Sequence, residues 1–581
     1  MNSTCECLVS PIYNLIGYKW IFLLMNCLFL CACSVTKPAV NFSDLESQLQ
    51  AVKTLPEKEQ SEKISELMNI NPLYSHRIIK YLKNEKAVNT SIIETVANSK
   101  KISIYKLLAY QGIDSVNITP LYHSASISIY SPNSVQPYFA QYKAKKNVDW
   151  ISLPLELDPV SDAYTTSILG LEEDTLYDVK LSLDENFSQV DFYHFKTKGE
   201  PNFSSHNTYH LADIYNGGVL DLVKLGLNGT ENNWVKIVGD DKTIISTNEL
   251  NKSAINIGNK SYIYFENITI SGGGVNAVSS DEAHHIRFNG CNISGWGRKG
   301  NIIKKGKFYA NLQDTKPINF DSAFSLTKTG VVTIENCQVH SPRSQANTWK
   351  TGHPHGANAV LIDANHPNVN YKGQIVIRNN RFYGTDSHRF NDVIESRNNG
   401  GSYGGFVRDS AIYNNYLAYA NDDIIEIDGS QFNVLVYDNE IEQGFCGISA
   451  IPNRQGPSFI FNNYIHNLGD ENGDSWAAVK LGGLLSRPAG KVNIFKNIIN
   501  TKSNGIASAN YYGDRTFWAD VWSNSITILN RHNYAILEKS PFSSNSYLNN
   551  VIIHPDGDGS LINVDDVMLF RQQNYFFKPS Y

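Results

Sequence analysis

Segment 421–429 carries carboxylates at a spacing that could support acid–base chemistry. It reads Asn-Asp-Asp-Ile-Ile-Glu-Ile-Asp-Gly. On a β-strand, successive side chains point to opposite faces, so Ile425 and Ile427 would share one face and Glu426 and Asp428 the other. Carboxyls two residues apart on one strand would be roughly 6–8 Å apart, which suits a general acid paired with a general base. We expect Glu426 to donate a proton and Asp428 to activate water.

Neighbouring strands repeat the same frame and extend this pair into a charged patch. Aligning the leading aliphatic residue of each strand puts one set of side chains in a single outward column: Glu395, Glu426, Ser449, Lys480 and Ala507. Glu395, one coil away, would raise the proton affinity of Glu426 by like-charge repulsion. Arg397 falls beside Asp428, where it could hold an anionic substrate group or keep Asp428 ionised.

The same acids permit a second chemistry, and the sequence leaves both open. Asp422, Glu426 and Asp428, together with Glu395, could bind Ca²⁺, which would neutralise a uronate carboxylate and acidify its C5 proton. Lys480, Arg397, His388 or a tyrosine would then be the base of a β-elimination. Hydrolysis would require no cofactor, whereas elimination would require Ca²⁺.

Cationic and aromatic residues occur in the longer connections around these strands. Aromatic faces beside cationic groups suit sulfated or uronic sugars. The expected substrate contacts, besides Arg397 and Lys480, are Arg298, His388, Arg389, Arg454 and Trp296. The net charge of −6 and the pI near 6.2 give no global attraction to nucleic acid or to a membrane surface. We therefore expect an acidic polysaccharide as partner, and a monomer.

A repeat explains how these strands would be positioned. A short apolar strand that ends in Asn or Cys recurs, and its last residues fall at 267, 291, 337, 380, 415, 439, 463, 497, 524 and 550. The shortest intervals are 24 residues. A strand-rich repeat of this length, with Asn stacked on Asn, predicts a right-handed parallel β-helix over 201–581. Cys291 and Cys337 share the Asn column, so we interpret them as buried core residues.

The region before the repeat has two parts. Residues 34–115 show Leu, Ile, Lys and Glu at helical spacing and are expected to form a helical spacer. Residues 116–200 alternate as in strands, and Gly170–Val179 resembles the loop and strand of a fibronectin type III sandwich in which a Tyr makes a corner hydrogen bond. The predicted fold class is therefore all-β, with a parallel β-helix preceded by a small β-sandwich and a short helical segment.

The first 33 residues are expected to be an export signal. Lys19 precedes the apolar run 20–30, which is short for a membrane span. The run ends in Leu-Cys-Ala-Cys-Ser, which resembles the bacterial lipobox and would make Cys33 the lipidated residue. This predicts an exported protein held at the bacterial outer membrane or cell surface by a lipid anchor alone.

The repetitive region resembles the pectate-lyase-like parallel β-helix superfamily, which includes pectin hydrolases, iota-carrageenases and the alginate lyase/chondroitinase B group. Glu426 and Asp428 are similar to the acid/base pair of iota-carrageenases, and Asp422-Asp423 is similar to the Asp pair of pectin hydrolases. Where the chondroitinase B group carries a Lys, this chain has Gly429-Ser430. The resemblance implies a hydrolase acting on an anionic polysaccharide. The alternatives are a Ca²⁺-dependent lyase and a surface lipoprotein that only binds glycan.

Overall fold

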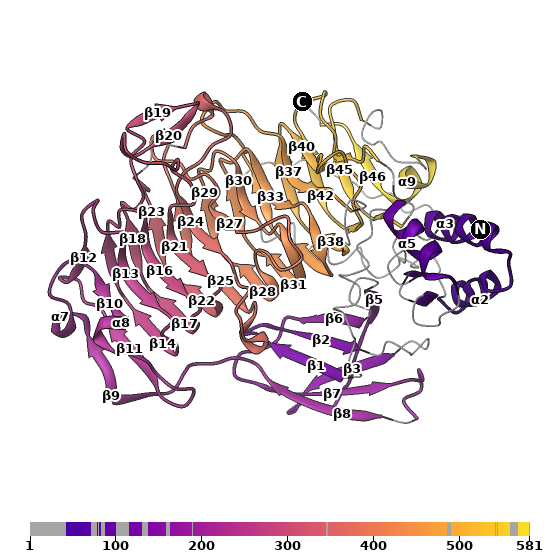
Figure 1. Ribbon diagram of the computed structural model, residues 1–581, viewed down its shortest axis with the longest axis horizontal. Helices are drawn as coiled ribbons and strands as arrows, with labels where there is room; N and C mark the ends of the chain where they lie inside the picture. Colours follow the sequence, from indigo (N-terminus) through magenta and orange to yellow (C-terminus); the bar gives the residue numbers. More distant parts are fainter. Residues whose placement is uncertain are drawn as a thin grey trace, which may run out of the picture.

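The computed structural model describes three bodies of secondary structure, shown in Figure 1. The described residues are 42–70, 78–79, 81–82, 88–99, 115–130, 138–158, 163–188, 190–343, 347–484, 490–540, 542, 544–557 and 567–579. Cys33 and the rest of the expected export signal lie outside them. In the described part of the chain, no helix is long and apolar enough to cross a membrane.

Three long parallel sheets wind into a right-handed β-helix, so the predicted fold class is confirmed. The first, which we call the site sheet, has the order β10 (Leu220–Asp221), β13 (Ser253–Gly258), β16 (Asn276–Asp281), β21 (Ser322–Thr327), β24 (Asn358–Ile362), β27 (Ile394–Ser396), β30 (Asp423–Glu426), β33 (Cys446–Ala450), β37 (Ala477–Leu481), β40 (Asn504–Ser508) and β43 (Ile536–Leu537).

The other two sheets complete each coil. The sandwich-facing sheet contains β9 (Phe203–His210), β11 (Trp234–Val238), β14 (Ile263–Glu266), β17 (His284–Asn289), β22 (Gly330–Glu335), β25 (Ile375–Arg378), β28 (Val407–Tyr413), β31 (Gly429–Tyr437), β35 (Ser458–Phe461), β38 (Val492–Phe495), β41 (Ala519–Trp522) and β44 (Ser546–Leu548), and β34 (Asn453–Gln455) pairs with β31. The third sheet contains β12 (Ile244–Ser246), β15 (Thr269–Ser271), β18 (Asn292–Ser294), β23 (Gln338–His340), β26 (Arg381–Tyr383), β29 (Tyr416–Ala418), β32 (Glu440–Glu442), β36 (Tyr464–His466), β39 (Ile498–Thr501), β42 (Ser525–Ile528), β45 (Val551–Ile553) and β46 (Tyr575–Phe577).

Aliphatic side chains fill the interior of the coils in columns. Ile263, Ile286, Val332 and Ile375 are adjacent in register on four successive strands, and each is at most 1% exposed. β-Branched residues suit this position because they pack well on a pleated surface. The resulting core is continuous from β11 to the last coils and holds the backbone of the site sheet rigidly.

An asparagine ladder stabilises the turn after the sandwich-facing sheet. The main-chain N of Asn415 donates to Oδ1 of Asn439 at 3.1 Å, and the main-chain N of Asn439 donates to Oδ1 of Asn463 at 3.2 Å. The pattern continues through Asn497, Asn524, Asn550 and Asn574. At its start Cys337 donates from its main-chain N to Asn380, and Cys291 donates to Cys337 Sγ. These cysteines are buried and free, as the repeat predicts.

Residues 115–196 form two antiparallel sheets of four strands. One has the order β1 (Ser115–Pro120), β2 (Ser124–Tyr130), β6 (Ala163–Leu169), β5 (Glu156–Asp158); the other has the order β4 (Ile151–Leu153), β3 (Phe139–Ala144), β7 (Leu176–Ser182), β8 (Asp191–Lys196). The two sheets share one core. Tyr177 Oη accepts a hydrogen bond from the main-chain N of Glu172 at 2.8 Å, at the corner that precedes β7. Membership of the fibronectin type III family stays a prediction.

The remaining elements are short. Helices α2 (Phe42–Val52), α3 (Glu57–Ile70) and α5 (Thr90–Ser99) share a small apolar core that includes Leu49, Ile64 and Ile93. A hairpin of β19 (Ile302–Lys304) and β20 (Lys307–Tyr309) interrupts the coils between β18 and β21. Helices α7 (Leu211–Ile214), α8 (Leu222–Leu225) and α9 (Val567–Gln573), and the 3-10 turns at Trp349–Thr351 and Val369–Tyr371, complete the described elements.

The sandwich packs against the middle of the β-helix. Leu121 and Tyr122 lie in one buried cluster with Val376, Ala411 and Leu435 of the sandwich-facing sheet. Polar contacts join the same surfaces: Ser126 Oγ donates to Asp409, and Ser167 Oγ donates to Asn433 at 2.8 Å. The three parallel sheets form the three faces of a prism. The site sheet is not the face on which the sandwich packs, so the sandwich leaves it uncovered (Figure 1).

Candidate functional site

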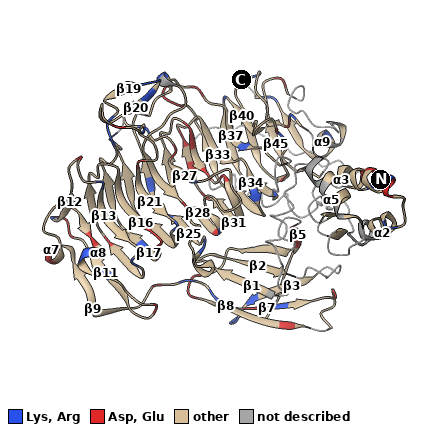
Figure 2. Cartoon of the chain, in the orientation of Figure 1, with Lys and Arg blue, Asp and Glu red and all other residues tan. Residues whose placement is uncertain are grey.

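The strand register builds the outward column expected from the sequence. Ile394 is paired with Ile425, so Glu395 lies beside Glu426; Glu426 is in turn paired with Ser449 and Ser449 with Lys480. Figure 2 shows acidic positions gathered around β27 and β33 and a basic position on β37. The middle coils of the site sheet therefore concentrate charge, as the repeat predicts.

Three aspartates converge where these strands begin. Asp392, Asp422 and Asp423 each offer a carboxylate oxygen, and these oxygens all lie within 4.8 Å of one another. Asp392 Oδ1 accepts a hydrogen bond from the main-chain N of Asp423 at 2.7 Å, which ties two successive coils together. Three carboxylates this close cannot all be ionised without strong compensation.

Two cationic groups compensate part of this charge. Lys480 Nζ lies 2.5 Å from Asp423 Oδ2, although Lys480 is on a strand two coils away. His353 Nε2 lies 2.9 Å from Asp422 Oδ2. The hydrogen bond to Asp422 raises the pKa of His353 to about 9, so this imidazole is cationic at neutral pH.

The protonation states of the cluster differ from one residue to the next. Burial raises the pKa of Asp392 well above its usual range, and the charge of Asp422 raises it further. Burial also raises the pKa of Asp423, against the pull of Lys480. The pKa of Asp422 is lowered, because the hydrogen bond from His353 and the charges of Lys480 and His353 outweigh burial. Asp422 is thus the member of the three whose ionised form the surroundings favour most.

The second group of acids lies beside the first. Burial raises the pKa of Glu426 well above its usual range, and the charges of Asp428 and Glu395 act in the same direction. Burial raises the pKa of Glu395 to about 8 and that of Asp428 to about 7. Asp428 Oδ1 accepts hydrogen bonds from Ser449 Oγ and from the main-chain N of Ile451, both at 2.7 Å. Glu426 Oε1 accepts weaker ones from Ser396 and Asn399.

These acids line one cavity of about 740 Å³ on the outside of the site sheet. Asp392, Glu395, Asp422, Asp423, Glu426 and Asp428 all contribute to its lining. Phe320 and the loop 353–355 form part of the wall, and aromatic Trp476 and Tyr511 lie among the lining residues from later coils. Lys480, Arg515 and Lys539 also come from later coils, so the cations are concentrated toward the C-terminal end. Carboxylates in two protonation states beside such a cavity can carry out acid–base chemistry on a bound ligand.

Several residues predicted to contact substrate do not line this cavity, and packing explains why. Trp296 is fully buried, with Nε1 donating to the main-chain O of Asn358, so it is a core residue. Arg389 is 4% exposed and donates to the carbonyl oxygens of Ala420, Gln443 and Gly469, which joins three successive coils. For both residues the predicted contact with substrate is wrong.

The other predicted contacts are also engaged elsewhere. Arg454 is fully buried and donates to the carbonyl oxygens of Gly400 and Gly483. Arg298 forms an ion pair with Asp321 at 2.5 Å, and His388 Nδ1 contacts the carbonyl oxygen of Pro342 at 2.9 Å. Arg397 stacks on Phe320 with 5.3 Å between the guanidinium carbon and the ring centroid, so it supports the cavity wall without lining the cavity.

A divalent cation would find a different set of ligands from the one predicted. The close group is Asp392, Asp422 and Asp423, whereas the sequence favoured Asp422 with Glu426 and Asp428. Asp428 is instead held by hydrogen bonds to the next coil. A cation at the aspartate group would have to compete with Lys480 and His353 for two of the three carboxylates.

Asp392, Asp423 and His353 belong to the site but were not among the predicted site residues. The signal for Asp392 was present: Asn391-Asp392 stands in the same register as Asp422-Asp423, one coil earlier. The signal for His353 was weaker: it begins a His-Pro-His sequence, which suggested a contact with metal or substrate, but it lies in a long connection whose path the repeat does not determine.

Comparisons with known proteins were made for sequence and for structure. No family model and no curated protein matches the chain by sequence. Among solved structures, the chain is similar to a mutant tailspike protein of E. coli bacteriophage HK620 in complex with a hexasaccharide, with 10% identity, a TM-score of 0.33, and coverage of 57% of this chain and 56% of the tailspike. The chain therefore spans little more than half the length of that protein.

Two other solved structures are matched over most of their length. They are the Yersinia enterocolitica family 28 exopolygalacturonase, with 12% identity, a TM-score of 0.29 and coverage of 78% of this chain and 98% of that chain, and the catalytic domain of a GH87 α-1,3-glucanase in complex with nigerose, with 10% identity, a TM-score of 0.27 and coverage of 80% and 91%. At these identities and scores, the likenesses concern the fold and assign no substrate.

Proposed function

We propose that the chain is a glycoside hydrolase that cleaves an acidic polysaccharide by general acid–base catalysis. The observation that carries the proposal is the group of six carboxylates in one cavity, of which Asp422 is ionised while Glu426 keeps its proton. Hydrolysis of a glycosidic bond needs one carboxylic acid and one carboxylate on either side of the bond.

The roles follow from these protonation states. Glu426, as expected from the sequence, donates its proton to the leaving oxygen as the glycosidic C–O bond breaks. Asp422 takes a proton from the water whose oxygen bonds to the anomeric carbon. This moves the base from Asp428 to Asp422, because the lowered pKa of Asp422 keeps it ionised, whereas Asp428 Oδ1 already accepts two hydrogen bonds from the next coil and burial raises the pKa of Asp428 to about 7. Glu395 lies beside Glu426, and ionisation of Glu395 would raise the pKa of Glu426 further, after burial and the charge of Asp428.

The cations at one end of the cavity support an acidic substrate. Arg515 and Lys539 are exposed lining residues, and within the described part of the chain neither has a salt bridge. A uronate or sulfate group would supply the missing negative charge there, while the scissile bond lies over Asp422 and Glu426. Trp476 and Tyr511 offer aromatic surface nearby for the sugar rings.

A Ca²⁺-dependent lyase is the second candidate, and the close group Asp392, Asp422 and Asp423 favours it. The predicted base Lys480 is less suitable, because the charges of Asp423 and its neighbours raise the pKa of its amine well above the usual value. A protonated Lys480 cannot abstract the C5 proton. Of the other expected bases, Arg397 and His388 do not line the cavity, whereas a tyrosine, Tyr511, does.

Product analysis separates these proposals. The protein is incubated with a panel of acidic polysaccharides, and new reducing ends and the absorbance of unsaturated uronate are recorded, with and without EDTA. The hydrolase proposal expects reducing ends without new absorbance and without an effect of EDTA. New absorbance that EDTA abolishes would establish the lyase. Binding without cleavage of any polysaccharide would support a surface lipoprotein that only binds glycan.

We propose further that the chain is exported and anchored at the bacterial outer membrane or cell surface through Cys33. The support is the lipobox-like sequence that ends at this residue. Labelling of the expressed protein with palmitate should be lost in the Cys33→Ala variant, and labelling that persists in the variant would contradict the anchor.

A further inference from the structure

A second cavity lies between the sandwich and the sandwich-facing sheet. Its volume is about 730 Å³, close to that of the candidate active site, but it is on a different face of the prism. His123, Leu171 and Glu173 contribute to it from the sandwich. Strands from β17 to β38 and the turns that follow them provide the rest. It shares no lining residue with the first cavity.

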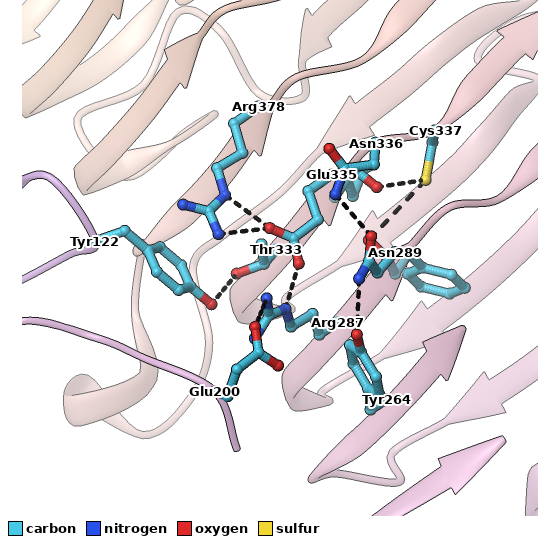
Figure 3. Close-up of polar contacts among 12 residues, drawn as sticks. Tyr122, Glu200, Tyr264, Arg287, Asn289, Thr333, Glu335, Asn336, Cys337 and Arg378 are labelled. Atoms are coloured by element: carbon cyan, nitrogen blue, oxygen red, sulfur yellow. Dashed lines mark hydrogen bonds and ion pairs between the residues drawn. The ribbon is translucent and has the colours of Figure 1, made fainter. Parts of the chain in front are cut away.

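The charges in this cavity are paired with one another. Glu335 is buried between two arginines: Arg378 Nε donates to its Oε2 at 2.7 Å, and Arg287 Nε donates to its Oε1 (Figure 3). Each guanidinium is also bound by an acid from outside the β-helix coils, Arg287 by Glu200 at 2.6 Å and Arg378 by Glu173. An anionic ligand would therefore gain little from these arginines.

One buried donor in this network is unused. Arg287 is 3% exposed, and its Nη1 has no hydrogen-bond partner. A buried donor without a partner costs free energy comparable to that of a lost hydrogen bond. Because Nη1 is itself buried, this donor is not open to a ligand, and hydrogen bonds to a ligand must come from the exposed polar side chains of the cavity.

Aromatic rings form a strip along the cavity. Tyr413, Tyr437, Phe461 and Phe495 stack from coil to coil, with centroids 4.7, 4.7 and 4.8 Å apart and interplanar angles of at most 7°. Their faces are covered by one another, so the ring edges are what the strip presents to the cavity. Such a strip gives the cavity an apolar wall, which can make van der Waals contact with the C–H groups of a sugar ring.

A column of polar side chains runs beside the strip. Asn336, Asn379, Asn414, Asp438, Asn462 and Lys496 follow the strands on six coils, and each has φ between 53° and 58°. All but the half-buried Asn462 are exposed. Successive coils are about 4.8 Å apart. This spacing is close to the length of one sugar residue in an extended glycan, so the column can offer one hydrogen-bonding group per sugar.

We infer that this cavity is a second, non-catalytic binding site for a neutral, hydroxyl-rich segment of polysaccharide that runs parallel to the axis of the β-helix. The ligand's C–H groups lie on the aromatic strip, and its hydroxyls bond to the polar column. The inference does not depend on the proposed hydrolysis, because none of these residues belongs to the first cavity.

Affinity electrophoresis of the full chain tests the inference. Native gels contain a neutral glucan, galactan, mannan or xylan, or an acidic polysaccharide, and the Glu426→Gln variant is used so that ligand is not cleaved. We expect at least one neutral polysaccharide to retard the protein. Combining Asn379→Gly, Asn414→Gly and Asn462→Gly should weaken that retardation about tenfold or more, because three hydrogen bonds are lost. Glycine accepts the positive φ of these turns, so the backbone is retained.

Matched controls occupy the same turn position on coils that lie outside the cavity. Asn267→Gly and Asn549→Gly change the same residue type at φ of 55° without altering the lining, and they should leave the retardation unchanged. Thermal unfolding of each variant checks that the fold is intact. The inference is overturned if no neutral polysaccharide retards the protein, if the triple variant is retarded as before, or if the controls lose binding to the same extent.

Discussion

Two cavities of nearly equal volume occupy two faces of the same prism, and they use charge in opposite ways. In the first, six carboxylates meet two close cationic partners, Lys480 and His353. In the second, the buried Glu335 is held between Arg287 and Arg378. Coil stacking supplies the same strand spacing to both faces. What differs is the chemical type of the side chains in their outward columns.

The difference shows how a repetitive scaffold can place catalysis on one face and non-catalytic glycan binding on another. Excess like charge keeps protons on buried acids, as at Glu426, and such acids can transfer them. Neutralised charge beside stacked rings offers shape and hydrogen bonds but no proton to move. A polysaccharide bound on one face could thus be held near the reaction on the other.

The largest expected effect is loss of hydrolysis at the first cavity. Asp422→Asn removes the base and Glu426→Gln removes the acid, so each should lower kcat by about 10²–10⁴-fold. Release of reducing ends from an acidic polysaccharide measures this. Asn414→Gly in the second cavity is the matched change and should leave kcat as it is. If Asp422→Asn and Glu426→Gln both retain full activity, the reaction does not take place at this site.

The next effect is on the free energy of unfolding, and it should be large only for the variant of the buried acid in the second cavity. Glu335→Gln leaves Arg287 and Arg378 buried around a neutral amide, which should lower the free energy of unfolding by about 3–5 kcal/mol. Glu426→Gln should change it by only about 1 kcal/mol, because the amide resembles the protonated acid already present. Urea unfolding monitored by circular dichroism compares the two. Equal losses would mean that the acids of both cavities are structural.

The pH dependence of stability should identify the first cavity. The pKa of Glu395 is raised from 4.5 to about 8 and that of Asp428 from 3.8 to about 7. The folded protein therefore holds protons that the unfolded chain has lost, so the free energy of unfolding falls as pH rises from about 4 to about 8. Glu395→Gln should reduce this slope between pH 4.5 and 8 by about one proton. The exposed Glu282→Gln is the control, and an unchanged slope in Glu395→Gln would contradict the assignment.

The β-helix and the outward column could be predicted because both follow from a strict repeat. The intervals of 24 residues between Asn415, Asn439 and Asn463 fix the coil length, and alternation along each strand then fixes which side chains point outward. Glu395, Glu426 and Lys480 could therefore be aligned without coordinates. Asp392 was available from the same argument, since it stands in register with Asp423.

Residues of the longer connections could not be placed in this way. Arg389 lies outside the strands and Arg454 lies on the short strand β34. Because both are charged, the sequence favoured solvent exposure for them. Both are instead buried against main-chain carbonyl oxygens. Trp296 is in the core for the same reason: the path of its connection is set by packing, not by the repeat. The second cavity requires the position of the sandwich against the β-helix, and no sequence periodicity encodes that position.

The smallest expected effect concerns the aromatic strip. Tyr437 stacks on Tyr413 and on Phe461, both at 4.7 Å between centroids, and each such contact contributes about 0.5–1.5 kcal/mol. Tyr437→Leu keeps an apolar side chain but removes both contacts, so it should lower the free energy of unfolding by about 1–3 kcal/mol and weaken neutral glycan binding. Tyr437→Phe keeps the stacking and is the matched control for both measurements. Tyr437 lines the second cavity, which is on a different face from the first. The kcat on an acidic polysaccharide should therefore stay unchanged in both variants. If kcat falls in Tyr437→Leu but not in Tyr437→Phe, the two faces are coupled. That result would contradict the proposal that catalysis and neutral glycan binding are independent.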